Sequence, residues 1–300
     1  MNSQRLPVIF IGHGSPMNAV HQNEYTAAWR ALGAELKPLV RAVLIVSAHW
    51  ATRGGLAVTT SKRPGALYDF YGFPETLYQI QYDAPGDPAL ARRIQEGFAG
   101  GGVSGGAGIH VHGDEERALD HGVWSILVHM FPEADVPVVQ LSYDMDAGPA
   151  EQIAFGRRLV DEQTDFETAS KIAGARDGAD ADEFGYNHAS LRDQGVLILT
   201  SGNIVHNLRE IDFSPSAPPR DWAIEFDRAV KSTLEEGPGN FDRLRDPAGF
   251  GDAGRLSVPT LDHYIPFLNF LGMVRDGEGI GFPCEGIQNG SVSMRSVRAG

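Results

Sequence analysis

Cysteine is nearly absent from this sequence, whose 300 residues include only Cys284. An intramolecular disulfide is therefore excluded, and so is a metal site built from several thiolates. No apolar run reaches the roughly 18 residues that a membrane-spanning helix needs, and Met1–Pro7 has neither the basic nor the apolar region of a signal peptide. We therefore expect a cytoplasmic protein in which His, Asp and Glu provide any metal ligands.

Cations are also scarce relative to acidic residues. Lys and Arg number 25 against 39 Asp and Glu, which gives a formal net charge of −14. Nucleic-acid binding requires clustered cations that neutralise phosphates, and an anionic membrane surface repels an acidic protein. We therefore expect a small-molecule partner and neither nucleic acid nor membrane. The sequence leaves a homo-oligomer open.

Hydrophobic residues make up 42% of the chain, enough for one large domain with a substantial core. Short apolar runs predict buried strands, and longer segments between them predict helices. The predicted strands are Pro7–Ile11, Ala42–Ser47, Val136–Leu141 and Val196–Thr200, and the predicted helices are Glu24–Leu36, Pro88–Phe98, Gly122–Phe131, Pro149–Val160 and Trp222–Glu235. This alternation indicates a single-domain α/β fold. A central, mostly parallel or mixed sheet is flanked by helices, with a metal site at the carboxyl ends of the strands.

Residues 161–190 interrupt the alternation with an acidic, Ala- and Gly-rich stretch that contains DGADADEF. Such a composition buries little apolar surface, so we interpret it as a mobile acidic insertion in a single catalytic domain of residues 1–300. Elsewhere, Asp87 and Asp221 each precede a predicted helix and are expected to cap it.

Three histidines follow predicted strands closely. His13 comes after the first strand in GHGSP, His49 after the second in SAHW, and His206 after the last in SGNIVHNL. One such histidine is usually an ordinary polar residue, but the strand ends of an α/β sheet meet in one region, and imidazole is the commonest metal ligand. Gly12 and Gly14 would let the main chain turn sharply around His13. The sequence therefore predicts a histidine-based metal site.

The other histidines have weaker contexts. His121 begins a predicted helix after Asp120, which either caps that helix or orients a histidine. His263 lies in TLDHYIPFLNFLG, where it could be only a helix-surface residue. His21, His129 and His188 are expected to be peripheral. His110 and His112 alternate in IHVHG and could bind a metal adventitiously, although no predicted strand end precedes them.

Motifs of other enzyme classes are missing or misplaced. Gly102–Gly106 matches GxSxG, but no strand leads into it, as a nucleophile elbow would require. The sequence has no GxxxxGK[ST] phosphate loop, no GxGxxG after the first strand and no HExxH zinc motif. The histidines thus remain the strongest indication of chemistry.

Several segments, taken in order, resemble one family. GHGSPMN, SAHW, LDHGVW, VPVVQLS, SGNIVHNL and DHYIP are similar to motifs of the LigB-type class III extradiol ring-cleavage dioxygenases, most closely the bacterial 4,5-DOPA dioxygenase branch. The resemblance extends from about Val8 to the C-terminal EGIQNGSVSMRSV and includes YDFYGFPETLY and APGDPALA. It implies an extradiol dioxygenase that cleaves a DOPA-like or other substituted catechol with O₂ at a non-haem Fe(II) centre.

The resemblance also implies roles for individual histidines. His13, His49 and His263 would be metal ligands, and His206 would be either the catalytic acid/base or a fourth ligand. His121 would contact the substrate or a ligand of the metal. Activity is expected to require Fe(II), although proteins of this branch resemble ones that carry Zn(II) at four such histidines.

The surroundings of these histidines are less well determined by the sequence. Phe70, Tyr71 and Trp50 are equally expected to wall an aromatic pocket or to belong to the core. Tyr68 and Tyr71 replace a His and a Gly in the HDFGGFP-like loop of the family, so a different catechol is expected to fit. Candidate hydrogen-bond partners of the histidines, with turn and capping roles as the alternative, are Asp120, Asn203 and Asn207.

Two other kinds of function stay open at this point. The same histidines could hold zinc with one open position, which would activate water in a zinc-dependent hydrolase. They could also form a closed zinc site in a non-catalytic scaffold, although the glycines around His13 argue against it because a closed site needs no room for substrate.

Overall fold

The computed structural model describes residues 5–99, 109–160, 190–214 and 217–300. Within these ranges, eight strands form one sheet in the order β4-β3-β5-β2-β6-β1-β10-β7. Their bounds are Val8–Gly12 (β1), Ala42–Thr52 (β2), Leu56–Thr59 (β3), Val111–Asp114 (β4), Val138–Asp144 (β5), Val196–Gly202 (β6), Ile280–Cys284 (β7) and Ser296–Ala299 (β10). A separate small sheet pairs Ile287–Gln288 (β8) with Val292–Ser293 (β9).

The middle of the large sheet is parallel. β5, β2, β6 and β1 are neighbours that all run in the same direction. At one side β10 pairs antiparallel with β1, and β7 pairs antiparallel with β10. On the other side β3 pairs antiparallel with β5 and parallel with β4. The predicted α/β class with a mixed sheet is therefore confirmed, and four parallel strands present their carboxyl ends at one edge.

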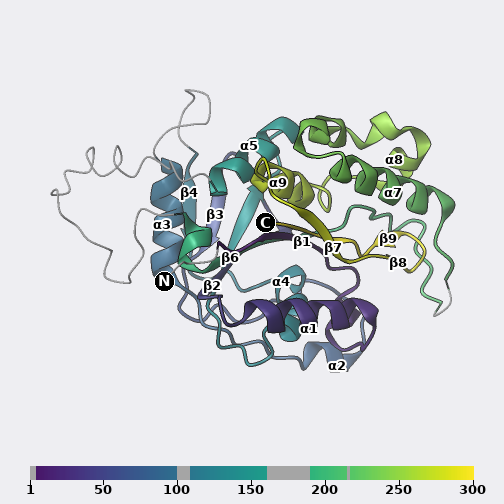
Figure 1. The fold of residues 1–300 in the computed structure, drawn as a ribbon. Helices are drawn as coiled ribbons and strands as arrows, with labels where there is room; N and C mark the ends of the chain where they lie inside the picture. The colour runs from purple at the N-terminus through teal and green to yellow at the C-terminus, as the bar shows by residue number, and fades with distance from the viewer. Residues whose placement is uncertain (1–4, 100–108, 161–189, 215–216) are drawn as a thin grey trace.

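Helices cover both faces of this sheet (Figure 1). α1, α2 and α4 lie on one side, and α3, α5 and α9 lie on the other, with α7 and α8 beyond α9. The α-helices are Glu24–Leu36 (α1), Glu75–Tyr78 (α2), Pro88–Ala99 (α3), His121–Met130 (α4), Pro149–Val160 (α5), Asp221–Glu235 (α7), Gly251–Ser257 (α8) and Ile265–Met273 (α9). Short 3₁₀ helices are Pro16–Ala19 (η1), Leu191–Gln194 (η2), Pro238–Arg245 (η3) and Pro247–Phe250 (η4).

The core is divided by the sheet into two halves. Successive side chains of a strand point to opposite faces, so Val8 and Phe10 of β1 pack with α5, α7 and α9, whereas Ile9 and Ile11 pack with α1 and α4. All four side chains are fully buried. A strand that is buried on both faces has a continuous run of hydrophobic residues, so these strands could be predicted from the sequence.

Two local predictions need correction, and one is confirmed. β2 does not end at Ser47 but continues to Thr52, so His49 lies inside the strand, where the pairing with β5 shifts register. Asp221 does not cap α7, because the helix begins at Asp221 and Arg220 occupies the N-cap position without a side-chain hydrogen bond. Asp87 does cap α3, since its Oδ1 accepts the main-chain N–H groups of Ala89 and Leu90.

Some predictions fall outside the described residues. The acidic stretch at 161–190 does so except for Ser190, and so do the GxSxG match Gly102–Gly106 and His188. The interpretation of 161–190 as a mobile insertion therefore stays a prediction. Among the residues that are described, no helix is both long and apolar enough to cross a membrane.

Candidate functional site

The ends of β1 and β6 position the first histidine. His13 follows the last residue of β1, and its main-chain N–H donates to the carbonyl of Gly202 at the end of β6 (3.1 Å). Gly14 has a φ of +64°, a conformation that favours glycine. A side chain on Gly12 would meet main-chain atoms of residues 293–295 at 2.8–2.9 Å. Both glycines are therefore needed for the path of this loop.

Three further histidines are brought to His13 by different elements. His49 comes from the irregular part of β2, and His121 is the first residue of α4. His263 lies just before α9 and is fixed by its carbonyl, which accepts the N–H of Asn203 at 2.9 Å. His263 is only 7% exposed, so it is not a helix-surface residue.

The fifth histidine, His206, lies in the loop after β6. Its main-chain N–H donates to Ser257 of α8 (2.9 Å), and it forms an isolated bridge with Val292. Its ring stacks on that of His263 with centroids 3.5 Å apart and planes 9° apart. The loop is thus held between α8 and the small β8–β9 sheet.

All five predicted site histidines meet in one cluster. The Nε2 atoms of His13 and His49 are 3.2 Å apart. The ring of His49 lies 3.9 Å from that of His121 and 4.9 Å from that of His263, measured between centroids. His13 lies 5.4 Å from His263. Such a concentration of imidazoles is a donor set suited to a metal ion.

Hydrogen bonds on the outer ring nitrogens indicate which nitrogen of each histidine is free. His13 Nδ1 lies 2.9 Å from the hydroxyl of Ser201, which donates its own proton to the carbonyl of Gly122 (2.6 Å), so Nδ1 carries the hydrogen. His263 Nδ1 lies 2.7 Å from a carboxylate oxygen of Asp262. Both histidines are left with an unprotonated Nε2, the usual arrangement of a histidine that binds a metal ion.

Asp69, which was not predicted from the sequence, also contacts the outer ring nitrogens of the cluster. The carboxylate of Asp69 lies 2.9 Å from His121 Nδ1 through Oδ1 and 3.4 Å from His49 Nδ1 through Oδ2. Asp69 belongs to the YDFYGFP segment, between β3 and α2. A carboxylate in a loop without periodicity gives no local signal, and the resemblance had drawn attention only to the tyrosines beside it.

The electrostatics of the cluster favour neutral imidazoles and charged carboxylates. Burial, reinforced by the neighbouring histidines, lowers the pKa of His13 and of His49 well below the ordinary value, and burial lowers the pKa of His206 to about 3. Burial raises the pKa of Asp69 and of Asp262, but hydrogen bonds from His121 and His263 outweigh it and hold both below their usual range. Metal binding requires neutral imidazole, the form that the lowered pKa values of His13, His49 and His206 favour at pH 7.

Asp120 takes part in a buried network and does not cap α4. It occupies the N-cap position, but its side chain makes no capping hydrogen bond. Its fully buried carboxylate accepts from Ser47 Oγ (2.7 Å) and from the side-chain amide of Gln140. Ser47 also accepts the N–H of His49 (3.2 Å), so this network supports the part of β2 where the pairing with β5 shifts register.

Asn203 and Asn207 fix main chain around the cluster. The Asn203 side chain donates to the carbonyl of Ser293 (2.8 Å), and that of Asn207 donates to the carbonyl of Leu256 (2.7 Å). These contacts join the loop after β6 to β9 and to α8. Among the described residues, the side chains of both asparagines thus bond main chain, as in the turn and capping roles weighed for them, and not a histidine ring.

The aromatic residues of the 68–73 loop divide into two groups. Phe70 packs edge-on against His121, with centroids 5.6 Å apart, whereas Tyr71 is 91% exposed. Trp50 is buried, and the guanidinium of Arg117 lies 5.1 Å above its ring. Of the three predicted wall residues, Phe70 is thus the one that contacts a site histidine through its ring.

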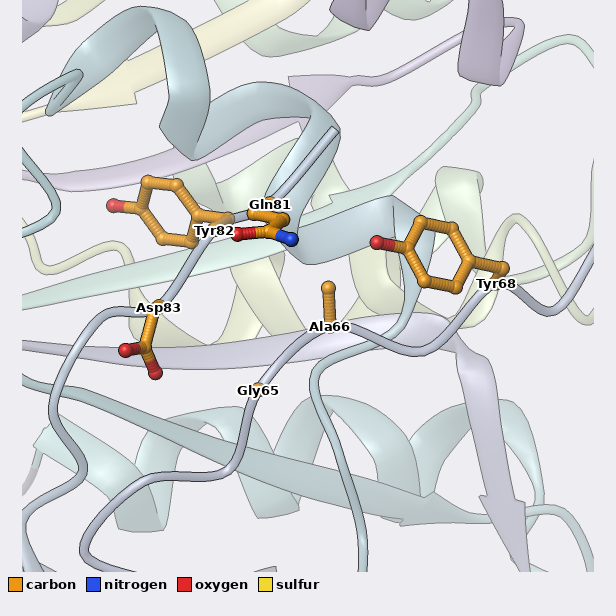
Figure 2. Close-up of a pocket in the computed structure, with 6 residues that line it drawn as sticks. All are labelled: Gly65, Ala66, Tyr68, Gln81, Tyr82 and Asp83. Atoms are coloured by element: carbon orange, nitrogen blue, oxygen red, sulfur yellow. The ribbon is translucent and has the colours of Figure 1, made fainter. Parts of the chain in front are cut away.

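Tyr68 faces a different space. It lines a cavity of about 220 Å³ together with residues from the segments 65–66 and 81–83, and Figure 2 shows its ring beside Ala66, with Tyr82 and Asp83 across the cavity. No histidine of the cluster lines this cavity. Tyr68 packs against Trp124 of α4 and against Phe70, and Phe70 in turn contacts His121.

The other described histidines lie apart from the cluster. His21, His110 and His112 are exposed. His129 is buried, where its Nε2 lies 2.8 Å from the carbonyl of Asn18 and its Nδ1 lies 3.0 Å from Arg30. The structure therefore brings together the histidines chosen as site residues and none of these four.

The fold and the cluster define a class of protein: an α/β protein that gathers histidines for a metal ion at the carboxyl edge of its parallel strands. A sequence model described as the catalytic LigB subunit of aromatic ring-opening dioxygenase matches residues 7–249. The chain belongs to this LigB family, which confirms the resemblance predicted from the motifs. It is accordingly an enzyme of the extradiol dioxygenase class, and the family implies a metal centre.

Relatives match the chain over most of its length. A 4,5-DOPA dioxygenase extradiol of Escherichia coli K12 is 40% identical to this chain over 302 aligned residues. The alignment covers 100% of this chain and 97% of the relative. One of Beta vulgaris is 32% identical and covers 88% and 85%. A crystal structure of an uncharacterized Escherichia coli K12 protein has a TM-score of 0.74 at 38% identity and covers 99% of this chain and 100% of that one.

Proposed function

We propose that the chain cleaves a catechol-type substrate, DOPA-like or otherwise substituted, with O₂ at a non-haem Fe(II) centre held by His13, His49 and His263. One observation carries the proposal: imidazoles from β1, β2 and the loop before α9 meet with their outer nitrogens directed to Ser201, Asp69 and Asp262. Three neutral nitrogen ligands leave other positions of an iron ion free. Bound Fe(II) would supply the redox chemistry that activation of O₂ requires.

His206 is the proposed acid/base rather than a fourth ligand. Its ring is parallel to that of His263 at 3.5 Å. His206, Asp262 and His263 have possible ligand atoms within 4.8 Å of one another, so the iron content of a His206 variant decides between the two roles. As the acid/base, a neutral His206 accepts a proton from a catechol hydroxyl and returns it later.

His121 is the proposed substrate contact. Its Nδ1 donates to Asp69, so its Nε2 is an acceptor for a hydroxyl group. Phe70 packs against the same ring and fixes its orientation. His121 and Phe70 form a partly apolar surface together with the buried His13 and His263. Such a surface would orient an aromatic ring and partly exclude water from it.

The substrate class is supported by the relatives, which are named 4,5-DOPA dioxygenases, and by the site chemistry. A catechol presents two adjacent hydroxyls, which match a metal ion flanked by proton acceptors. Tyr71 is 91% exposed and follows Phe70 in the chain, and we propose that it contacts a substituent of a bound ring. The HDFGGFP-like loop that the chain resembles has Gly at this position, so Tyr71 is the proposed cause of a different substrate preference.

The proposal is tested with protein purified without oxygen, freed of metal and reloaded with Fe(II) or Zn(II). A panel of catechols, including DOPA, is followed for O₂ consumption and for the yellow absorbance of a ring-fission product. We expect one O₂ per catechol with Fe(II) and none with Zn(II). A zinc-loaded protein that hydrolyses model esters while the iron-loaded form consumes no O₂ would point to a hydrolase instead.

A further inference from the structure

Asp69 contacts two histidines of the cluster with one carboxylate. Oδ1 lies 2.9 Å from His121 Nδ1, and Oδ2 lies 3.4 Å from His49 Nδ1. The Asp69 side chain is 19% exposed, and the rings of the two histidines are 3.9 Å apart between centroids. Asp69 itself is too far back to be a ligand, because it faces the Nδ1 side of both rings.

We propose that Asp69 is a positioning residue that fixes the tautomers of His49 and His121 together, so that both present an unprotonated Nε2 to the metal and the substrate. A carboxylate only accepts hydrogen bonds, so the Nδ1 of His121, which is hydrogen-bonded to Oδ1, carries the proton. His49 Nδ1 lies 3.4 Å from Oδ2, and the negative charge there favours the same tautomer without a formed hydrogen bond. The inference rests on the proposed function in one respect, namely that His49 is a metal ligand. The tautomers themselves do not depend on that assignment.

The N-terminus of α4 explains why an anion is held at this place. Asp69 Oδ1 also accepts the main-chain N–H of His121, the first residue of α4, at 3.0 Å. Asp120, at the N-cap, is engaged with Ser47 and Gln140, so its carboxylate does not serve this helix end. Asp69 belongs to a different loop, but its carboxylate accepts a hydrogen bond at this helix end. The partial positive charge of a helix N-terminus favours a carboxylate there.

The loop that carries Asp69 is held rigidly on the segment before α4. The N–H of Leu67 donates to the carbonyl of Leu119 (2.6 Å), and the N–H of Leu119 donates to Gly65 (3.0 Å). The indole N–H of Trp124 donates to the carbonyl of Leu67 (2.9 Å). Because these hydrogen bonds join the residues just before Asp69 to α4 and to the segment before it, the carboxylate is held beside His121.

The first test measures the tautomers in the metal-free chain. Long-range ¹H–¹⁵N spectra of the imidazoles, assigned with His49→Gln and His121→Gln, should show Nδ1–H for both histidines at pH 7.5. In Asp69→Asn the amide has one acceptor oxygen and an NH₂ group that repels Nδ1–H, so at least one of the two should change to Nε2–H. Nε2–H at either residue in the wild-type chain would overturn the proposal, even if the variant failed to fold.

The second test measures the affinity for Zn(II) by competition with a chelator. Loss of the partner that orients a ligand typically weakens metal binding about 10–100-fold, so Asp69→Asn should bind in that range, and Asp69→Glu should recover part of the loss. Asp242→Asn removes the same charge at a 79%-exposed position in η3 and should bind as the wild type does. If Asp69→Asn binds Zn(II) as tightly as the wild type, the proposal for Asp69 is contradicted. If the wild-type protein itself binds no metal, the proposed function is contradicted, and the tautomer test alone decides the role of Asp69.

Discussion

At the scale of single residues, the histidines of the cluster differ in what their outer ring nitrogen contacts. His13 and His263 each have a hydrogen-bond acceptor there, in Ser201 and Asp262. For His206 no such ring hydrogen bond occurs among the described residues, and its ring contact is the stack on His263. Because no described residue engages the ring nitrogens of His206 in a hydrogen bond, they are available to exchange a proton with a bound substrate, as an acid/base must.

Substitution of His206 should therefore separate metal binding from catalysis. In His206→Gln we expect bound iron close to that of the wild type and a kcat lower by about 10²–10⁴, the usual contribution of a general acid/base. In His13→Gln we expect loss of iron, measured by mass spectrometry after gel filtration. The exposed His112→Gln serves as the control for both measurements. Loss of iron in His206→Gln would assign His206 to the ligands instead.

His129 gives a prediction on acid stability that is independent of the cluster. Burial lowers its pKa, the carbonyl of Asn18 offsets this in part, and Arg30 lowers it further. The unfolded chain takes up a proton on His129 near pH 6.5, but the folded chain does so only at lower pH, so stability falls as pH drops below 6.5. The contribution of His129 to this slope, which is the difference between the wild type and a variant that lacks it, should stay under about 1.4 kcal/mol per pH unit, the limit for one proton.

The measurement is urea denaturation of the metal-free chain between pH 5 and pH 8. His129→Gln keeps a donor for Asn18 and an acceptor for Arg30 but cannot titrate. Its unfolding free energy should therefore decline less with acid than that of the wild type. Equal slopes for the two proteins would show that His129 titrates alike in the folded and unfolded chains.

The histidines that follow buried strands could be predicted from the sequence, because the strand pattern itself places them near the sheet. His13 and His206 come next to or shortly after buried strands, and those strands are neighbours in the sheet. Asp69 and His263 reach the cluster from loops whose path depends on tertiary contacts with α4 and β6. Periodicity carries no information on such paths, so His263 needed the family resemblance and Asp69 was missed.

At the scale of elements, length and amphipathic pattern decided what the sequence revealed. α1 and α5 were predicted with their observed bounds because each has an apolar face over 12 or 13 residues. β3, β4 and β10 have only four residues each, too few for a pattern, and they were missed. β2 was cut short because its second half contains His49 and Thr52, whose polarity hides a continuing strand.

The contact between α5 and α9 yields a prediction at this scale. A Cβ on Gly156 of α5 would lie 1.8 Å from the main-chain oxygen of Asn269 in α9, so the helices must separate to accept any side chain. Gly156→Ala should lower the unfolding free energy by about 1–3 kcal/mol, as overpacking usually does. It should also weaken Zn(II) binding, because α9 directly follows His263.

The control for this contact is Gly239→Ala. Gly239 has open space around its Cβ position and no positive φ, so that substitution should leave both quantities unchanged. Urea denaturation gives the unfolding free energy, and chelator competition gives the metal affinity. A Gly156→Ala protein that is destabilised but binds metal normally would show that α9 can shift without moving His263.

At the scale of the whole molecule, the sheet order explains why one site collects segments so distant in the chain. β2, β6 and β1 are adjacent and parallel, and the antiparallel β10 lies next to β1. The main chain beyond β6 is tied to residues 257, 263 and 291–293. The cluster therefore lies at the carboxyl ends of the parallel strands, where it brings together residues from β1, β2, α4 and the segment before α9.

A metal ion held by this cluster should link these segments and stabilise the whole fold. At a free Zn(II) concentration about 100 times Kd, binding to the folded chain alone adds about 2.7 kcal/mol to the unfolding free energy. We expect Tm, measured by calorimetry, to fall when a chelator removes the metal and to return with Zn(II) or anaerobic Fe(II). The double variant His13→Gln, His49→Gln should show one Tm with or without metal, and His112→Gln should behave as the wild type. A chelator-induced drop that persists in the double variant would place the stabilising ion at other residues than the cluster.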